Sequence, residues 1–340
     1  MKAVRFHAHG GPEVLRYEDA PDPIAGPGDA LIRVRACALN HLDLWQRRGM
    51  ERVRIPFPHI SGADVAGEVI STPNGEFAAG TRVMLQPGLS CGRCRACLDG
   101  RDNECPKYEV LGYFSDGGYA EIVRVPLQNV IAIPDSIGFI EAAAFPLAFL
   151  TAWHMLLTRA HLIAGEDVLV LGAGSGVGQA AIQIARQHGA RVIATGGADD
   201  KLARARQLGA AEVINHTTED VAAMARQYTN GRGVDIVVEH VGTATWASSL
   251  KSLARSGRLV TCGATTGHDA GIDLRVLFVR QLSLLGSYMG RKAELLSAAQ
   301  FFFAGHVRPI VDHTFPLAEA AAAHRRLENR EQFGKIVLVP

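Results

Sequence analysis

The sequence has no long apolar run and no excess of charge of either sign. No stretch approaches the roughly 18 apolar residues that cross a bilayer, and residues 1–20 lack the hydrophobic segment of a secretory signal. The formal net charge is +1, whereas binding to nucleic acid or to an acidic membrane needs a clear basic excess. We therefore expect a cytoplasmic protein without a nucleic-acid or membrane partner.

Cysteine is scarce, and four of the six cysteines lie close together. They are Cys91, Cys94, Cys97 and Cys105. Disulfides are disfavoured in a reducing compartment, whereas four soft thiolates close a tetrahedral zinc site. We expect one zinc ion per subunit in a lobe at about residues 88–108. This zinc is structural, because four thiolates leave no position for water or substrate. The alternative is an iron–sulfur cluster, since ferredoxins also use the Cys-x2-Cys-x2-Cys pattern.

The pattern of the sequence changes near its middle. Up to about residue 147, short alternating runs such as "ALIRVRACAL", "DVAGEVIS" and "TRVML" predict strands of an antiparallel, partly barrel-like domain. From about Gly165, strands such as "DVLVLG" and "RVIAT" alternate with helical patterns such as "DKLARARQLGA" and "ATWASSLKSLARSG". This alternation predicts a doubly wound parallel sheet, and hence an α/β fold of two domains. After about Gly286 the chain returns to the first domain and ends in the strand "GKIVLVP".

A glycine-rich turn follows the first strand of the second domain. The glycines of "VLVLGAGSGVGQAAIQIA" do not meet the strict GxGxxG spacing, yet they join a strand to a helix. In that setting a glycine turn holds a pyrophosphate at the helix N-terminus. The alternative is a tight turn without a ligand. The candidate cofactor-binding residues are Gly174, Ser175, Gly176, Val177 and Gly178.

The end of the second strand of this domain favours NADPH over NADH. Folds that prefer NAD place Asp or Glu there to bind the ribose 2′-OH, whereas this sequence has Gly196 in "ATGGADDK". Lys201 and Arg204 lie one helical turn further on, where they can neutralise a 2′-phosphate. Asp199 and Asp200 fit a helix N-cap. The rival interpretation is that Asp199 folds back onto the ribose.

These motifs together resemble the medium-chain dehydrogenase/reductase superfamily, which includes zinc alcohol dehydrogenases and zinc-free quinone oxidoreductases. The resemblance covers the whole chain and rests on "GPGDALIRVRACALNHLDLWQRRG", "PHISGADVAGEV", the cysteine lobe, "GGYAEIVRVP", "TAWHML", "GVDIVVEHVG" and "FGKIVLVP". It implies a GroES-like catalytic domain (1–147 and 287–340) and a Rossmann domain (148–286). It also implies a nicotinamide cofactor in the cleft between the domains, and a homodimer or homotetramer. The apolar run 272–290 is a candidate dimer seam of strands.

The resemblance also locates the catalytic zinc ligands of the alcohol dehydrogenases. Their Cys, His-Glu and Cys-or-Asp positions read Asn40, Ala63-Asp64 and Leu147 in this sequence. One remaining carboxylate does not hold zinc, which needs three protein ligands and a water. The alternative is a site rebuilt from neighbouring residues such as Cys37, His41 and His59.

Without a Lewis acid, reducing an activated double bond is easier than oxidising an ordinary alcohol. Hydride adds to the β-carbon of an enone, enoyl thioester or quinone, and negative charge spreads to the carbonyl oxygen, where a hydrogen-bond donor stabilises it. The Asn40 amide is the first candidate for this donor. His41 and Asp43 support it or relay a proton, although Asp43 also fits a helix cap or a pair with Arg47. Asp64 is the fourth candidate catalytic residue.

Further cofactor contacts are implied by position. Thr151 resembles a contact to the nicotinamide ribose, and Gly286-Ser287 resembles a contact to the nicotinamide amide. Val241 and Gly263 follow strand ends, at the edge of a parallel sheet where ligands bind. Lys335 matches a recurrent position near the cofactor cleft.

The favoured function is NADPH-dependent transfer of hydride to a small molecule with a conjugated carbonyl or a quinone. One alternative is an NAD(P) alcohol dehydrogenase with an atypical zinc site. The other is an NADPH-binding regulatory protein with little catalysis.

Overall fold

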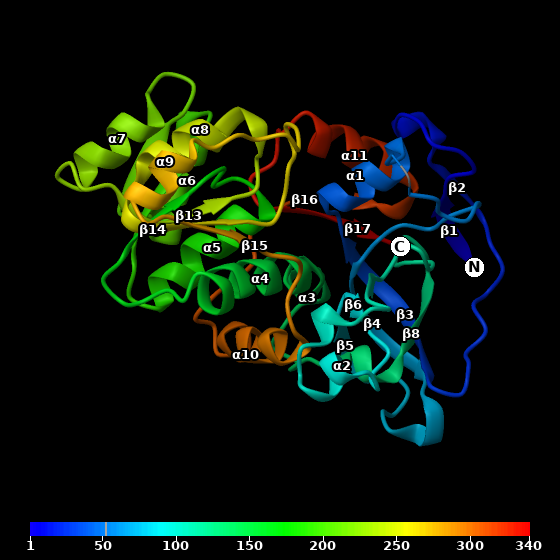
Figure 1. The fold of residues 1–340 in the computed structure, drawn as a ribbon. Helices are drawn as coiled ribbons and strands as arrows, with labels where there is room; N and C mark the ends of the chain where they lie inside the picture. The colour runs from blue at the N-terminus through cyan, green and yellow to red at the C-terminus, as the bar shows by residue number, and fades with distance from the viewer. Residues whose placement is uncertain (52) are drawn as a thin grey trace. The chain divides into compact units, whose positions relative to one another are not determined.

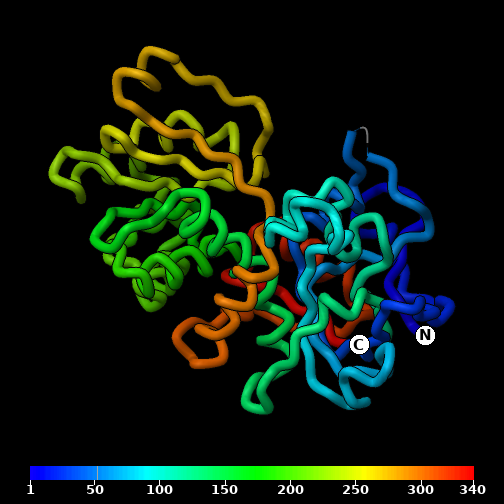
Figure 2. The backbone as a smooth tube through the Cα atoms, turned by 60° about the horizontal axis from the view of Figure 1, so that its bottom comes forward, coloured from blue at the N-terminus to red at the C-terminus, as the bar shows by residue number. Residues whose placement is uncertain are grey.

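The computed structural model describes residues 1–51 and 53–340 and divides into two compact units. Unit 1 comprises Met1–Leu147 and Arg291–Pro340, and unit 2 comprises Ala148–Gly290. The chain thus returns to unit 1 after Gly290, where the sequence suggested Gly286. Figure 2 follows the chain through each unit by colour. Each unit has its own cluster of buried apolar side chains.

Unit 1 is built around the long strand β3 (Asp29–Ala38), which pairs antiparallel with three other strands. Alternate residues of its first half are buried, as the alternating sequence predicted. The sheet order is β16-β17-β3-β4-β5-β9, with β8 also on β3, and all pairs are antiparallel except β16 with β17. The expected, mostly antiparallel first domain is confirmed. The other strands of unit 1 are β1 (Lys2–Arg5), β2 (Arg16–Asp19), β4 (Asp64–Ser71), β5 (Arg82–Leu85), β6 (Gly88–Leu89), β7 (Glu109–Val110), β8 (Ile122–Pro126), β9 (Val130–Ala132), β16 (Val311–Pro316) and β17 (Lys335–Val339).

Helices of unit 1 come from both of its chain segments (Figure 1). Helix α1 begins directly after β3, and α11 lies between β16 and β17 in the sequence. The division between the units falls inside α4 (Pro146–Trp153). The helices of unit 1 are α1 (His41–Arg48), α2 (Arg95–Leu98), α3 (Phe139–Ala144), α10 (Lys292–Phe303) and α11 (Ala320–Glu328).

Unit 2 is a six-stranded parallel sheet in the order β12-β11-β10-β13-β14-β15. All four residues of β10 are buried, as expected for a strand covered on both faces. The strand order reverses at β10, which defines a switch point where doubly wound folds bind ligands. The predicted doubly wound sheet is confirmed. Its elements are β10 (Asp167–Val170), α5 (Gly176–Gln187), β11 (Arg191–Gly196), α6 (Asp199–Leu208), β12 (Glu212–Asn215), α7 (Val221–Tyr228), β13 (Val234–Glu239), α8 (Thr243–Ser252), β14 (Leu253–Thr261), α9 (Leu274–Val279) and β15 (Ser283–Gly286).

Three local expectations in unit 2 are wrong. The run 272–290 was expected to form strands, but α9 occupies Leu274–Val279 and only β15 is extended. The helix expected to continue to Gly257 ends at Ser252, because Leu253 already belongs to β14. Asp199 and Asp200 are not N-caps: Ala198 holds the N-cap position of α6 and both acids lie in its first turn. Acidic residues there still interact favourably with the helix dipole.

Candidate functional site

The four clustered cysteines can surround a single metal ion. Their sulfur atoms all lie within 4.8 Å of one another. Metal–sulfur bonds of about 2.3 Å place tetrahedral ligands about 3.8 Å apart, so this spacing fits one ion rather than a larger cluster. Backbone N–H groups of Cys91 and Lys107 point at the Cys105 sulfur, at 3.5 and 3.3 Å. A hydrogen bond from the Arg93 backbone is the main cause that lowers the pKa of the Cys91 thiol to about 6, which favours the thiolate that zinc requires.

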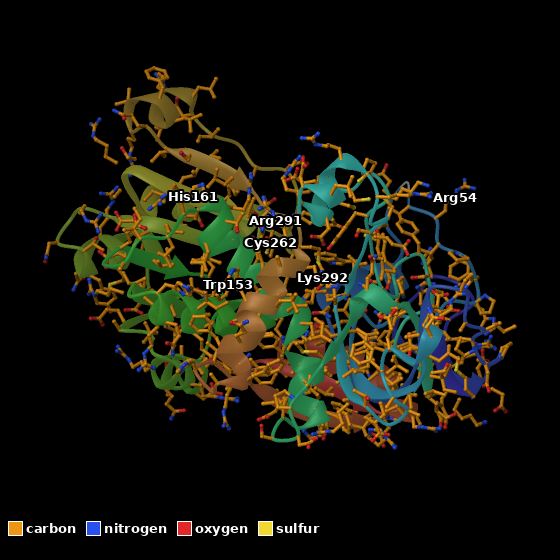
Figure 3. The ribbon with its side chains drawn as sticks, turned by 90° about the horizontal axis from the view of Figure 1, so that it is seen from below. Arg54, Trp153, His161, Cys262, Arg291 and Lys292 are labelled. Atoms are coloured by element: carbon orange, nitrogen blue, oxygen red, sulfur yellow. The ribbon has the colours of Figure 1, made fainter. Side chains whose placement is uncertain are left out.

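The cysteine lobe is tied to the start of α10, where Arg291 and Lys292 are labelled in Figure 3. Asp102 lies between the third and fourth cysteines, and its carboxylate accepts from the Lys292 backbone N–H at 3.1 and 3.2 Å. The Lys292 ammonium also donates to the carbonyl of Gln128. The lobe therefore satisfies one of the unpaired N–H groups of the helix that opens the second segment of unit 1.

Asn40, Asp64 and Lys335 come together in unit 1 as a buried polar triad. The Lys335 ammonium donates to Asn40 Oδ1 at 2.6 Å and to Asp64 Oδ2 at 2.9 Å. The Asn40 amide nitrogen donates to the same carboxylate oxygen at 3.0 Å. Asp64 is 0% and Lys335 3% exposed. The Lys335 ammonium is thus held by two of the four predicted catalytic side chains, a contact that the sequence did not suggest.

The positions that correspond to catalytic zinc ligands do not fit zinc. Asn40 Oδ1 and Asp64 Oδ2 accept hydrogen bonds from the Lys335 ammonium. The Leu147 backbone N–H donates to Asp64 Oδ1 at 2.8 Å. Among residues 1–51 and 53–340, the four-cysteine set is the only group of three or more His, Cys, Asp or Glu close enough to share an ion. A site rebuilt from Cys37, His41 and His59 is therefore not formed in this part of the chain. Burial raises the pKa of the Cys37 thiol well above its usual value, which also disfavours a thiolate ligand.

The triad fixes the orientation of the Asn40 amide. An ammonium only donates hydrogen bonds, so the atom facing Lys335 is the amide oxygen and the nitrogen faces Asp64. One of the two amide N–H bonds remains for another acceptor. Asn40 is the N-cap of α1 and is only half-buried, whereas Asp64 and Lys335 are buried.

The other two candidate catalytic residues belong to α1. Asp43 is buried, and its Oδ2 accepts from the Asn40 backbone N–H at 2.7 Å and from Tyr119 Oη at 3.0 Å. The expected helix-cap role of Asp43 is therefore present, whereas Arg47 instead bonds Gly10, His324 and Glu328. His41 opens α1 with its ring 6.4 Å from the Trp45 ring, tilted by 58°. The structure thus unites Asn40, Asp43 and Asp64, and places His41 beside Trp45.

Tyr119 and His324 are functional candidates that the sequence analysis missed. Tyr119 lies in the "GGYAE" motif, which belongs to the resemblance and by itself indicates no contact with Asp43. His324 lies within the alanine-rich helix α11, where nothing in the local pattern indicates its contacts.

The cofactor candidates of unit 2 line one edge of its sheet. Ser175 is the N-cap of α5, and its Oγ accepts from the Gly178 N–H at 2.8 Å. A Cβ at Gly178 would lie 2.2 Å from the carbonyl oxygen of Gly172, so only glycine allows this close approach of helix and strand. The candidates Gly196, Val241, Gly263 and Gly286 follow or end β11, β13, β14 and β15.

A nicotinamide dinucleotide fits this edge. The first turn of α5 presents backbone N–H groups suited to a pyrophosphate. Ser287 Oγ is buried and has no partner in the described part of the chain, as expected of a hydroxyl that a ligand satisfies. Thr151 is buried in α4. Cys262, labelled in Figure 3, precedes Gly263, and burial raises the pKa of its thiol to about 12, which makes it unreactive.

The edge beyond β11 contains both signs of charge. Gly196 ends β11, and a Cβ there would lie 2.8 Å from Leu202 Cδ2. The Asp199 carboxylate accepts from the Asn215 amide at 3.1 Å, which holds it at the ends of β11 and β12. Lys201 is half-buried in the first turn of α6. The acid of the rival interpretation, Asp199, is therefore bonded to Asn215 at the end of β12.

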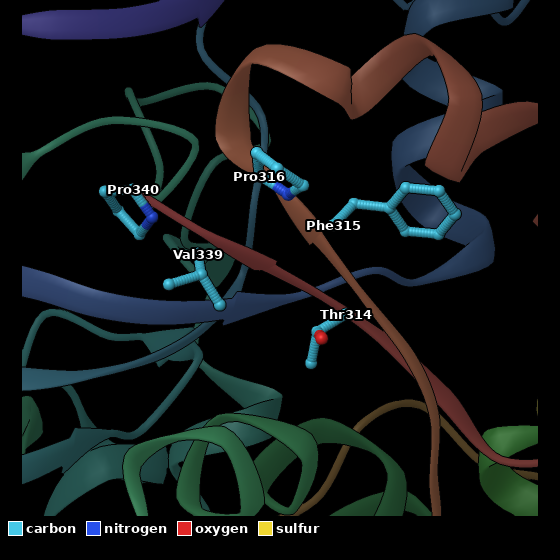
Figure 4. A pocket seen from close by; sticks show the side chains of 5 residues that line it. All are labelled: Thr314, Phe315, Pro316, Val339 and Pro340. Atoms are coloured by element: carbon cyan, nitrogen blue, oxygen red, sulfur yellow. The ribbon is translucent and has the colours of Figure 1, made fainter.

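A pocket at the ends of β16 and β17 is distinct from these sites (Figure 4). It lies at the opposite end of β17 from Lys335, about 13 Å along a strand of this length. Its lining has one hydroxyl and no charged side chain. The lining residues are Thr314, Phe315, Pro316, Val339 and Pro340.

Comparisons with known proteins agree with the fold and the site. Residues 26–135 match the family model for an alcohol dehydrogenase GroES-like domain, and residues 176–304 match that for a zinc-binding dehydrogenase. A quinone oxidoreductase of Pseudomonas aeruginosa is 32% identical over 100% of this chain and 99% of its own length. An NAD-dependent alcohol dehydrogenase of Sulfolobus acidocaldarius is 31% identical over 99% of each. A solved structure of an NAD-dependent alcohol dehydrogenase has a TM-score of 0.97 and 46% identity, with 100% of both chains covered.

The chain therefore belongs to the zinc-type, alcohol dehydrogenase-like branch of the medium-chain dehydrogenase/reductase superfamily. It is an oxidoreductase with a GroES-like and a Rossmann domain, as the resemblance implied. None of the helices that the structure describes has the length and apolarity of a membrane span.

The metal content should be one zinc ion per chain, measured by mass spectrometry of the purified protein. Asn40→Ala and His41→Ala should keep this ion. Cys94→Ser should lose it and lower the Tm by roughly 5 °C, because the lobe that caps α10 loses its ligand. Cys262→Ser is the matched control and should keep both the metal and the Tm. Two zinc ions per chain would contradict a single structural site.

Proposed function

We propose that this protein transfers hydride from NADPH to a quinone or an α,β-unsaturated carbonyl without a catalytic zinc. The supporting observation is the Asn40–Asp64–Lys335 triad. Asn40 and Asp64 stand at positions where alcohol dehydrogenases have catalytic zinc ligands, and here they hold the Lys335 ammonium. The relationship to quinone oxidoreductases is consistent with this chemistry.

The triad prepares Asn40 to stabilise an oxyanion. NADPH held at the sheet edge of unit 2 would supply the hydride that adds to the β-carbon of the substrate, and negative charge would then develop on the carbonyl oxygen. The free N–H of Asn40 donates to that oxygen. Lys335 acts on the other end of the same amide, where its positive charge polarises the group and makes the N–H a stronger donor. His41 follows Asn40 in the sequence and its ring lies 6.4 Å from that of Trp45, and His41 is the candidate for returning a proton.

The second candidate function is alcohol oxidation, which the names of two relatives favour. It requires a Lewis acid or another means of lowering the pKa of the alcohol, and the donor set at residues 40, 64 and 147 does not fit zinc. A regulatory protein that binds NADPH with little catalysis is the third candidate, and a turnover assay with quinones, enones and alcohols separates all three.

Asn40→Ala should lower kcat for enone or quinone reduction by about 100-fold or more, as removal of one oxyanion donor does in other enzymes. NADPH binding, measured by fluorescence titration, should be unchanged. Asn329→Ala, at the exposed C-cap that follows α11, is the control and should behave like the wild type. Normal turnover by Asn40→Ala would remove the amide from the mechanism.

The cofactor proposed is NADPH, with NADH as the alternative. Gly196 leaves the second strand without a carboxylate, and Lys201 brings a positive charge to the first turn of α6. Asp199, held by Asn215, is the group that opposes a 2′-phosphate. The balance between these charges decides the preference.

The ratio of kcat/KM for NADPH to that for NADH should exceed one. Lys201→Ala should lower this ratio by about 10-fold, the value of one lost charge-assisted contact, and Asp199→Asn should raise it. Lys251→Ala, an exposed lysine on α8, is the matched control. A wild-type preference for NADH would contradict the proposal.

We also propose a homodimer or homotetramer that uses the edge of the unit 2 sheet. β15 is the last strand of that sheet, and α9 exposes Leu274 and Phe278 at 66% and 67%. Light scattering should give two or four times the chain mass of 36.4 kDa. Phe278→Glu should reduce the assembly, because a charge disrupts an apolar contact. A wild-type monomer would exclude this assembly.

A further inference from the structure

Four buried side chains of unit 1 form a chain of hydrogen bonds that ends beside Asn40. Arg47 Nη1 lies 3.1 Å from His324 Nδ1, and His324 Nε2 lies 3.3 Å from Tyr119 Oη. Tyr119 Oη lies 3.0 Å from Asp43 Oδ2, which accepts the Asn40 backbone N–H at 2.7 Å. All four side chains are at most 1% exposed.

The chemistry of the two ends fixes the direction of every bond in this chain. A guanidinium only donates, so His324 Nδ1 accepts and the ring proton is on Nε2. Nε2–H then donates to Tyr119 Oη, whose own O–H is free to donate to the Asp43 carboxylate. The chain therefore points from the Arg47 cation to the Asp43 anion, and each donor polarises the next one.

We propose that His324 is a positioning residue, which acts through Tyr119 to hold the Asp43 carboxylate against the Asn40 backbone N–H. Residue 40 is then fixed at two points. Lys335 and Asp64 orient its side chain, whereas the chain from Arg47 fixes its backbone at the start of α1. The inference rests on the proposed role of the Asn40 amide.

Burial separates the titrations of these groups. It raises the pKa of Asp43 to about 6 and that of Tyr119 well above its usual value. It also lowers the pKa of His324 to about 3, with the nearby charges of Arg47 and Arg48 acting in the same direction. His324 and Tyr119 thus stay neutral near pH 7, and Asp43 is the member that titrates. The ionisable groups that face Asp43 and Tyr119 from the packed elements are Cys37, Arg47, Asp64, His324 and Lys335.

The ionised form of Asp43 is the one that accepts both hydrogen bonds. The bond from Tyr119 lowers the pKa of Asp43 against the effect of burial, so breaking the chain should raise that pKa. Asn40 is then held in place only at higher pH. The pH at which kcat falls on the acid side of the profile should therefore rise together with the pKa of Asp43.

The test measures the Asp43 carboxyl directly, by NMR of protein with 13C-labelled aspartate, with the signal assigned through Asp43→Asn. Tyr119→Phe keeps the ring and should raise the pKa by about one unit. His324→Asn keeps an acceptor for Arg47 but loses the donor to Tyr119, and should raise the pKa by less. His324→Gln can restore that donor and should remain near the wild type. Tyr228→Phe in unit 2 is the matched control.

An unmoved titration in folded Tyr119→Phe would overturn the inference, as would equal shifts in the Asn and Gln variants. A merely structural role would lower the Tm without moving the titration. The kcat profile for quinone or enone reduction, recorded on the same variants, should shift in parallel. If the wild type reduces neither substrate, the proposed function fails. The titration of Asp43 still tests whether His324 acts on Asp43 through Tyr119. If turnover is present but the titration is unmoved, only this inference fails.

Discussion

The ion pair between Lys335 and Asp64 is the contact on which the candidate site depends. Both groups are removed from water, so the loss of either partner leaves a buried charge, at a cost of about 3–5 kcal/mol. The pair joins the last strand, β17, to β4. Strand β3 lies between them in the sheet and ends two residues before Asn40. The position and orientation of the Asn40 amide therefore follow from the pairing of these three strands.

The same pair gives a physical reason why the residues at positions 40, 64 and 147 do not fit a zinc ion. A zinc site of the alcohol dehydrogenase kind needs ligands that point at a common vacancy. In this chain the amide and the carboxylate point at an ammonium, and Leu147 contributes only its backbone N–H. The cysteine lobe has no part in this triad, and its four sulfur atoms lie within 4.8 Å of one another, as one zinc ion requires.

Much of the fold could be predicted from local pattern. The alternation in β3 and the buried run of β10 are properties of short segments. The spacing of the four cysteines likewise lies within one short segment, so their convergence on one metal site could be predicted. In contrast, Lys335 and His324 meet their partners across 271 and 205 residues, and no periodicity encodes such contacts. The segment Leu274–Val279 was wrongly expected to be a strand, because short apolar runs do not distinguish strand from helix.

The order in which the chain is made gives the split arrangement of unit 1 a further meaning. Unit 2 is continuous, so its sheet can form as soon as residue 290 has left the ribosome. Unit 1 is then still without Lys335 and His324. Asp64 and Asp43 are carboxylates that must stay hydrated until these partners arrive. Unit 1, which contains the candidate site, is thus the last to close. A nascent chain that lacks the residues after 290 contains the complete parallel sheet of unit 2 and an incomplete candidate site in unit 1.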